Sequence, residues 1–153
     1  MFTALGSRAL LLAACLSMLV LATPARAQLD PSILSTLNYD QLEWLEDEAT
    51  PGSWYTVLSG DPSKAEPFVI LNKVLKGTFS RPHFHATARQ VYVADGTWWV
   101  GSGTDRNIAD SVAKSEGSYV DQPANQVHWD GAKDDDVLLM IAGEGPATET
   151  FVN

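Results

Sequence analysis

The stretch GTFSRPHFHATARQVYVADG, residues 77–96, carries two histidines that are separated by a single residue. In a β-strand, residues i and i+2 project from the same face, so His83 and His85 would point together while Phe84 points away. The chain contains three histidines, and the third is His128 in QPANQVHWDG. Imidazole is a good ligand for Zn, Cu, Fe and Ni. The pattern predicts a metal site formed by all three histidines. The alternative is that HxH occurs by chance and His128 is a surface residue.

Short apolar segments that are typical of β-strands surround this stretch. They are rich in β-branched and aromatic residues and comprise WYTVL (54–58), FVILNKVLK (68–76), QVYVA (90–94), TWWVG (97–101) and VLLMIAG (137–143). Gly- and Asp-containing turns separate them, and Asp95-Gly96 predicts a tight hairpin. We therefore expect an all-β fold, a small antiparallel β-barrel or jelly roll. A short N-terminal helical segment within residues 29–45 would precede it, with Asp30 as its cap and Pro31 in its first turn.

Two motifs in the chain resemble those of the cupin family of small β-barrels. The first family motif, G-x5-H-x-H-x3–4-E-x6-G, is matched by Gly77, His83, His85 and Gly96. The second, G-x5-P-x-G-x2-H-x3-N, is matched by Gly117, Pro123 and His128, with Asn125 in the second glycine position. Asparagine can adopt the left-handed conformation that such a glycine takes. The resemblance covers roughly residues 67–143, and it implies a single cupin domain over residues 28–153.

Two further departures from the family motifs affect the expected metal site. The glutamate of the first motif, which is normally the fourth metal ligand, is replaced by Arg89 or by Gln90, depending on the spacing. Arg89 is a permanent cation and cannot bind a metal, whereas Gln90 could do so through its amide oxygen. Only one of these two neighbours can face the barrel interior, and an inward Arg89 would suit an anionic substrate. The asparagine of the second motif is replaced by Ala132, which removes one supporting hydrogen bond.

The resemblance also implies a function, since cupins similar to this chain include three-histidine iron dioxygenases that cleave diketones and thiols. We expect one divalent metal ion per chain, Fe, Mn, Ni or Zn, held by the three histidines with Gln90 or water completing the shell. Three neutral ligands leave the metal charge and some coordination positions available for a small organic substrate. Arg89 and Tyr92 are the candidates for orienting that substrate. Inward aromatic residues such as Trp98 or Trp99 could line its pocket, although an ordinary hydrophobic core explains them equally well.

Several alternatives to a dioxygenase stay open at this point, because one barrel supports many reactions. Isomerase or lyase chemistry would use the same metal site. The missing glutamate also suits a non-catalytic cupin module that binds a small molecule or a metal. Two further hypotheses involve no catalysis. One is a carbohydrate-binding domain with exposed tryptophans, and the other is a structural β-domain whose histidines bind no metal. Whether the protein is an enzyme is therefore an open question, with metal-dependent catalysis as the leading hypothesis.

The N-terminus predicts export. Residues 1–27 combine Arg8, an apolar run and the cleavage pattern Ala25-Arg26-Ala27, so we expect a signal peptide and a periplasmic or secreted bacterial protein. The alternative is a lipoprotein, since LAAC ending at Cys15 resembles a lipobox. Without that segment the chain has no cysteine and is more acidic than its net charge of −9. This charge argues against nucleic acid and anionic membranes as partners. We expect a small-molecule ligand, no stable membrane anchor and a possible homodimer.

Overall fold

The computed structural model describes residues 36–152. The predicted signal peptide, Cys15 and the first part of the expected helical segment lie outside the described residues. The described part of the expected helical segment contains one 3-10 turn, η2 (Tyr39–Gln41). Strand β1 (Leu45–Glu46) follows it. Nowhere in residues 36–152 is there a helix with the length and apolar character needed to span a membrane.

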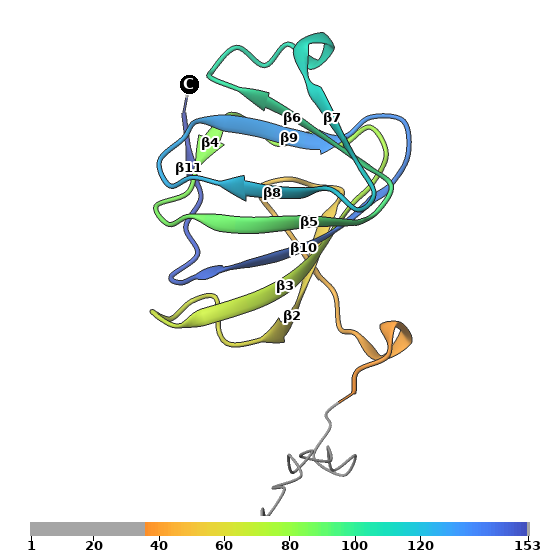
Figure 1. Ribbon diagram of the computed structural model, residues 1–153, viewed down its shortest axis with the longest axis vertical. Coiled ribbons are helices and arrows are strands. Elements are labelled where there is room, and N and C mark those ends of the chain that lie inside the picture. Colours follow the sequence, from red (N-terminus) through yellow and green to blue (C-terminus); the bar gives the residue numbers. More distant parts are fainter. Residues whose placement is uncertain (1–35, 153) are drawn as a thin grey trace, which may run out of the picture. The chain divides into compact units, whose positions relative to one another are not determined.

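Two antiparallel sheets make up the fold (Figure 1). In spatial order, the six-stranded sheet contains β1, β2 (Ser53–Ser59), β3 (Pro67–Val74), β10 (Val137–Glu144), β5 (Arg89–Asp95) and β8 (Tyr119–Gln122). The five-stranded sheet contains β11 (Thr150–Phe151), β4 (His83–Phe84), β9 (His128–Ala132), β6 (Thr97–Ser102) and β7 (Val112–Ser115). A second 3-10 turn, η3 (Ile108–Asp110), precedes β7. The predicted all-β jelly roll is confirmed.

The hydrophobic core lies between the sheets and is built from alternate residues of the long strands. Val91 pairs with Ile141 across β5 and β10, and Ile141 pairs with Ile70 across β10 and β3, so these side chains form one inward-facing row. Trp98 on β6 packs into the same core from the other sheet. Burying one such side chain contributes about 1.5–3 kcal/mol. The branched and aromatic residues that predicted strands therefore also supply the contacts that hold the two sheets together.

The Asp95-Gly96 turn is a corner between the sheets, so the prediction of a tight hairpin is wrong. Strand β5 pairs with β10 and β8, whereas β6 pairs with β9 and β7. Gly96 has φ +76°, and a Cβ at this position would collide with the carbonyl oxygen of Asp136. The sequence signal for a sharp turn was correct, but the two strands that leave it pair with other partners.

The second cupin-like motif is joined to the first through Asn125. This residue occupies the glycine position of the motif and has φ 60°, as expected for an asparagine that takes the left-handed conformation. Its backbone N–H donates to the carbonyl oxygen of His85 at 2.8 Å. The turn before β9 is thereby tied to the segment after β4, and His128 comes close to the other two histidines.

Candidate metal centre

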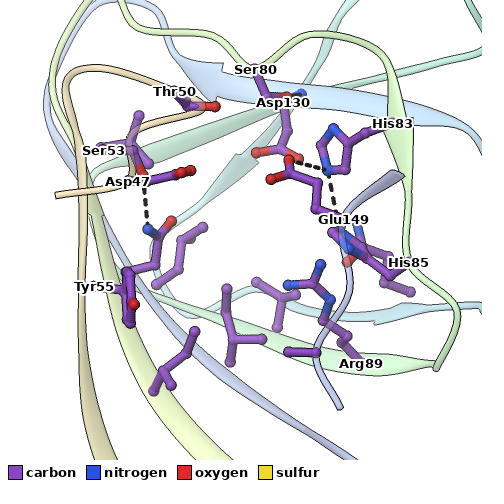
Figure 2. Close-up of a pocket in the computed structure, with 18 of the residues that line it drawn as sticks. Asp47, Thr50, Ser53, Tyr55, Ser80, His83, His85, Arg89, Asp130 and Glu149 are labelled. Atoms are coloured by element: carbon purple, nitrogen blue, oxygen red, sulfur yellow. Dashed lines mark hydrogen bonds and ion pairs between the residues drawn. The ribbon is translucent and has the colours of Figure 1, made fainter. Parts of the chain in front are cut away.

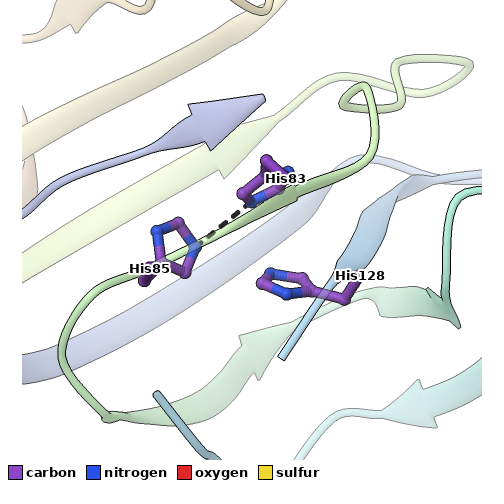
Figure 3. A group of neighbouring side chains, drawn as sticks. All are labelled: His83, His85 and His128. Atoms are coloured by element: carbon purple, nitrogen blue, oxygen red, sulfur yellow. Dashed lines mark hydrogen bonds between the residues drawn. The ribbon is translucent and has the colours of Figure 1, made fainter. Parts of the chain in front are cut away.

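The three histidines lie together inside the barrel. His83 begins β4, His85 follows the end of that strand, and His128 begins β9, directly opposite His83 in the β4–β9 pair. All three are buried, with at most 7% of any one exposed. Their rings turn toward one another (Figure 3), with centroids between 4.4 and 5.1 Å apart. The strand pairing, rather than the HxH spacing alone, is what adds the third imidazole.

Backbone carbonyls fix the orientation of each ring. Nδ1 of His83 lies 2.8 Å from the Arg81 oxygen, and Nδ1 of His85 lies 2.7 Å from the Thr148 oxygen. Nδ1 of His128 lies 2.9 Å from the Gln126 oxygen. A carbonyl can only accept, so each Nδ1 carries the proton, and the Nε2 of each neutral ring keeps a free lone pair. Hydrogen bonds of this kind, from the ring nitrogen that does not bind the metal, orient histidines that bind metals.

The three Nε2 atoms form a site that a divalent metal fits. Nε2 of His83 and Nε2 of His85 are 3.1 Å apart, and the ligand atoms of all three histidines lie within 4.8 Å of one another. With both Nδ1 atoms protonated, no hydrogen is available between these two Nε2 atoms unless one ring becomes a cation. A metal about 2.1 Å from each nitrogen would instead use all three lone pairs. Spacing, tautomers and burial together satisfy the requirements of a three-histidine metal centre.

Charged and polar side chains surround the three Nε2 atoms. Glu149 Oε1 lies 3.4 Å from His83 Nε2, and Asp130 Oδ2 lies 3.6 Å from His128 Nε2. Gln122 Nε2 lies 2.7 Å from His128 Nε2, and an amide can turn to offer its oxygen instead. Burial lowers the pKa of His128, and the nearby Asp130 counteracts this. The centre therefore has two carboxylates and one amide beside its three imidazoles.

A cavity of about 190 Å³ opens beside the three histidines (Figure 2). The apolar part of its lining, called the apolar floor, includes Ile70, Val91, Trp98, Leu139 and Ile141. Away from the histidines its wall is polar and includes Asp47, Thr50, Ser53, Tyr55 and Asn72. At about 30 Å³ per water, the cavity holds roughly six waters or a small organic molecule. Its mixed lining suits a ligand that carries both apolar and polar groups.

Strand alternation decides which motif residues reach this cavity. Arg89 and Val91 of β5 line it, whereas Gln90 and Tyr92 lie on the outer face of the sheet. The Gln90 amide donates to Asp121 on β8, and Tyr92 is 41% exposed. Neither residue reaches the histidines, which corrects the assignment of Gln90 as an alternative ligand and of Tyr92 as a substrate contact. Arg89 is the candidate that remains. Ala132, in the asparagine position, is part of the core.

Three residues of the centre were missed by the sequence reasoning. Asp130 lies two residues after His128 in β9, so the alternation of that strand was a usable signal. Gln122 pairs with Arg89 across β8 and β5, and this register becomes visible only once the sheet is known. Glu149 lies beyond the family motifs, in the segment before β11, and no pattern in the sequence pointed to it. Its approach depends on β11 pairing with β4.

A family model for the ChrR cupin-like domain matches residues 34–147, which is most of the chain. The protein is a cupin. The match includes all three histidines, and it confirms the resemblance found in the two motifs. A comparison with curated proteins finds no match.

Solved structures agree with this cupin fold. The polyketide cyclase RemF from Streptomyces resistomycificus superposes with a TM-score of 0.66 at 12% identity, covering 79% of this cupin and 87% of that chain. A cupin-2 domain protein from Rhodospirillum rubrum superposes with a TM-score of 0.61 at 14% identity, covering 78% of this cupin and 80% of that chain. A structure of the DMSP lyases RdDddP and RnDddQII superposes with a TM-score of 0.58 at 18% identity, covering 73% of this cupin and 63% of that chain. These similarities establish the shared barrel.

The carboxyl group of Glu149 predicts a pH effect on the stability of the metal-free cupin. Burial raises the pKa of Glu149 from its ordinary 4.5 to about 7, and the negative charge of Asp47 adds to this effect. Between these pH values the folded state holds a proton that the unfolded state has released, so the free energy of unfolding falls as pH rises. Glu149→Gln should remove this decrease in the free energy of unfolding. We expect a decrease of about 1–2 kcal/mol, because the Glu149 side chain is 28% exposed and solvent screens part of the effect.

Urea unfolding of both forms at pH 4.5 and pH 7, without metal, measures this difference. Other charged groups face Glu149 and also affect the free energy of unfolding. Subtracting the value of the variant from that of the wild type at each pH removes the contribution that these groups make to both proteins. They are Asp47, His83, Arg89, His128 and Asp130. Glu144→Gln, at the exposed end of β10, controls for the loss of a surface charge. A pH dependence that is the same in wild type and Glu149→Gln would contradict the prediction.

Proposed function

We propose that this protein is an exported, mononuclear metal-dependent cupin enzyme that acts on a small organic molecule by dioxygenase-type oxidation. The observation that carries the proposal is the set of three buried Nε2 atoms, which are left unprotonated because every Nδ1 donates to a carbonyl. The adjoining cavity supports a small substrate. Oxygenase chemistry is favoured by the neutral donor set and by the resemblance to three-histidine dioxygenases.

His83, His85 and His128 would hold one divalent metal, for which iron is our first choice and manganese, nickel or zinc are the others. Bound by three neutral imidazoles, such a metal would supply Lewis-acid and oxygen chemistry at open coordination positions. The side chains beside it have their own tasks. Glu149 can accept a proton from a substrate at the Nε2 end of the cavity. The apolar floor excludes water from the reacting end, and Arg89 orients the substrate.

The second candidate function is a cupin module that binds a small molecule or a metal without turnover. The observation that favours it is the cation at position 89, where the family motif has a carboxylate ligand. This module would have the same metal centre and the same cavity. Metal binding is therefore common to both functions, and only turnover separates them.

Metal content and oxygen uptake test the proposal. The protein is produced with its own N-terminus in a bacterial host and purified from the periplasm without chelator, beside His85→Ala. We expect about one metal ion per chain in the wild type and little in the variant. The iron-loaded protein should consume oxygen with at least one member of a panel of pentane-2,4-dione, 3-mercaptopropionate and lactate. N-terminal sequencing of the periplasmic protein tests cleavage after Ala27, and light scattering tests whether the protein is a homodimer.

Each outcome of this experiment decides between the functions. Bound metal with oxygen uptake supports the enzyme. Bound metal without uptake for any substrate on the panel favours the binding module. A protein that neither carries metal nor takes it up on titration would overturn both.

A further inference from the structure

Arg89 is a cation inside the barrel, at the edge of the metal centre. It begins β5, pairs with Gln122 of β8, and lines the same cavity as His83 and His85. Figure 2 shows its guanidinium directed into the cavity, on the side where Glu149 and His85 lie. The family motif has a glutamate in this region of the first motif, so this chain has a cation where the motif has an anion.

The guanidinium of Arg89 has no protein partner in the part of the chain that the structure describes. No hydrogen bond from the Arg89 side chain is found there, and no carboxylate lies within the 4.0 Å of an ion pair. Burial lowers the pKa of Arg89 to about 10, with Asp130 and Glu149 opposing that shift, so the group is a cation at neutral pH. A shielded charge without a partner is costly, and proteins normally pair it.

The two carboxylates whose charges act on Arg89 are directed to the histidines instead. Glu149 lies 3.4 Å from His83 Nε2, and Asp130 lies 3.6 Å from His128 Nε2. Asp130 also accepts a hydrogen bond from Trp98 Nε1 at 3.1 Å, which holds it in that position. Arg89 therefore presents an unpaired planar fork of N–H donors to the cavity, and a bound anion would supply the missing partner.

We propose that Arg89 forms a carboxylate-binding subsite and that the molecule this cupin binds is a small organic acid. The carboxylate would pair with the Arg89 guanidinium, which matches its planar geometry. The remainder of the acid would extend over the apolar floor toward the three Nε2 atoms. The proposal rests on the proposed function for the role of the histidines, but the subsite itself needs only Arg89 and the cavity.

The charges around the cavity favour a carboxylate over a phosphate. A phosphate monoester carries up to two negative charges and usually requires several cationic or N–H donors. Among residues 36–152, one arginine and three acidic residues line the cavity; the acidic residues are Asp47, Asp130 and Glu149. These would repel a dianion more strongly than a monoanion. The volume of about 190 Å³ sets a further limit, because it accommodates an acid of a few carbons.

Matched acid and amide probes test the subsite. Binding of lactate and of lactamide is measured on the chelator-treated, metal-free protein through tryptophan fluorescence, since Trp98 lines the cavity, and by calorimetry. We expect lactate to bind at least about tenfold more tightly than lactamide, in line with a charge-assisted hydrogen bond. Arg89→Gln should abolish this preference, and Arg89→Lys should retain part of it. Arg106→Gln, whose guanidinium donates to the Phe79 carbonyl away from the cavity, should behave as wild type.

The acid–amide comparison on the wild type needs no variant, so the proposal stays testable even if Arg89→Gln fails to fold. Equal binding of lactate and lactamide would overturn it, and so would an Arg89→Gln protein that keeps the preference. A preference that appears only after zinc is added would place the carboxylate on the metal, and this would also overturn it. A zinc titration of the same protein tests the proposed function separately. If zinc does not bind, the proposed function fails, whatever the acid–amide comparison shows.

Discussion

Replacing His128 by alanine should weaken zinc binding by at least about 100-fold. The variant would lose one of three ligands, and losses of about 10- to 100-fold in metal affinity already follow from removing a residue that only hydrogen-bonds to such a ligand. His128 is also the ligand that joins the second motif to the first, since it lies opposite His83 across β4 and β9. A competition titration against a chromophoric chelator gives the affinity. The matched control is Gln126→Ala, because the oxygen that accepts from His128 Nδ1 is a backbone atom and survives the substitution.

Thermal unfolding provides a second measurement of the same prediction. A metal that binds the folded state alone stabilises it by about 4 kcal/mol when its concentration is 1,000 times the dissociation constant. Zinc at this concentration should therefore raise the Tm of the wild type and of Gln126→Ala, and should raise the Tm of His128→Ala by less than half as much. Equal zinc affinity and equal Tm shifts in wild type and His128→Ala would show that the three Nε2 atoms do not form a metal centre.

Substituting Gly131 by alanine should destabilise the fold by about 3 kcal/mol or more. A Cβ on Gly131 would lie 2.7 Å from the Phe79 Cα and closer still to the Thr78 carbonyl oxygen. Both atoms belong to the backbone that bridges to β9, so rotating a side chain cannot relieve the contact. Overpacking a tight site typically costs 1–3 kcal/mol, and moving the backbone adds to this cost. The same bridge leads into β4, so the distortion would also reach His83.

Urea unfolding of Gly131→Ala beside Gly103→Ala separates the close contact from the general effect of losing a glycine. Gly103 has φ +83° and no atom within 4 Å of the position of a Cβ, so its substitution carries only a conformational cost of about 1 kcal/mol. Gly131→Ala should cost clearly more, and its zinc affinity should fall as well. Equal losses in the two variants would mean that β9 and the segment before β4 do not pack as closely as described.

Much of this protein could be predicted from the strand patterns and the two motifs. The branched and aromatic segments predicted β3, β5, β6 and β10 to within a few residues, because side chains that alternate between a core and solvent leave a readable pattern. Strand β9, with the sequence HWDGA, was not predicted as a strand. Four of its five residues are buried and it contains a glycine, so it lacks both the alternation and the branched residues on which the prediction relied.

Sequence alone identified the cupin barrel and the three histidines, since glycine positions, HxH spacing and a unique third histidine are local features of the chain. The sequence did not decide whether Arg89 or Gln90 faces the barrel interior. The tertiary structure places Arg89 there, because Arg89 pairs with Gln122 and the side chains of these two residues line the cavity. Glu149 and the carbonyl of Thr148 reach the histidines only because β11 returns to pair with β4. The tertiary structure determined these contacts because they depend on strand register and on chain segments more than 60 residues apart.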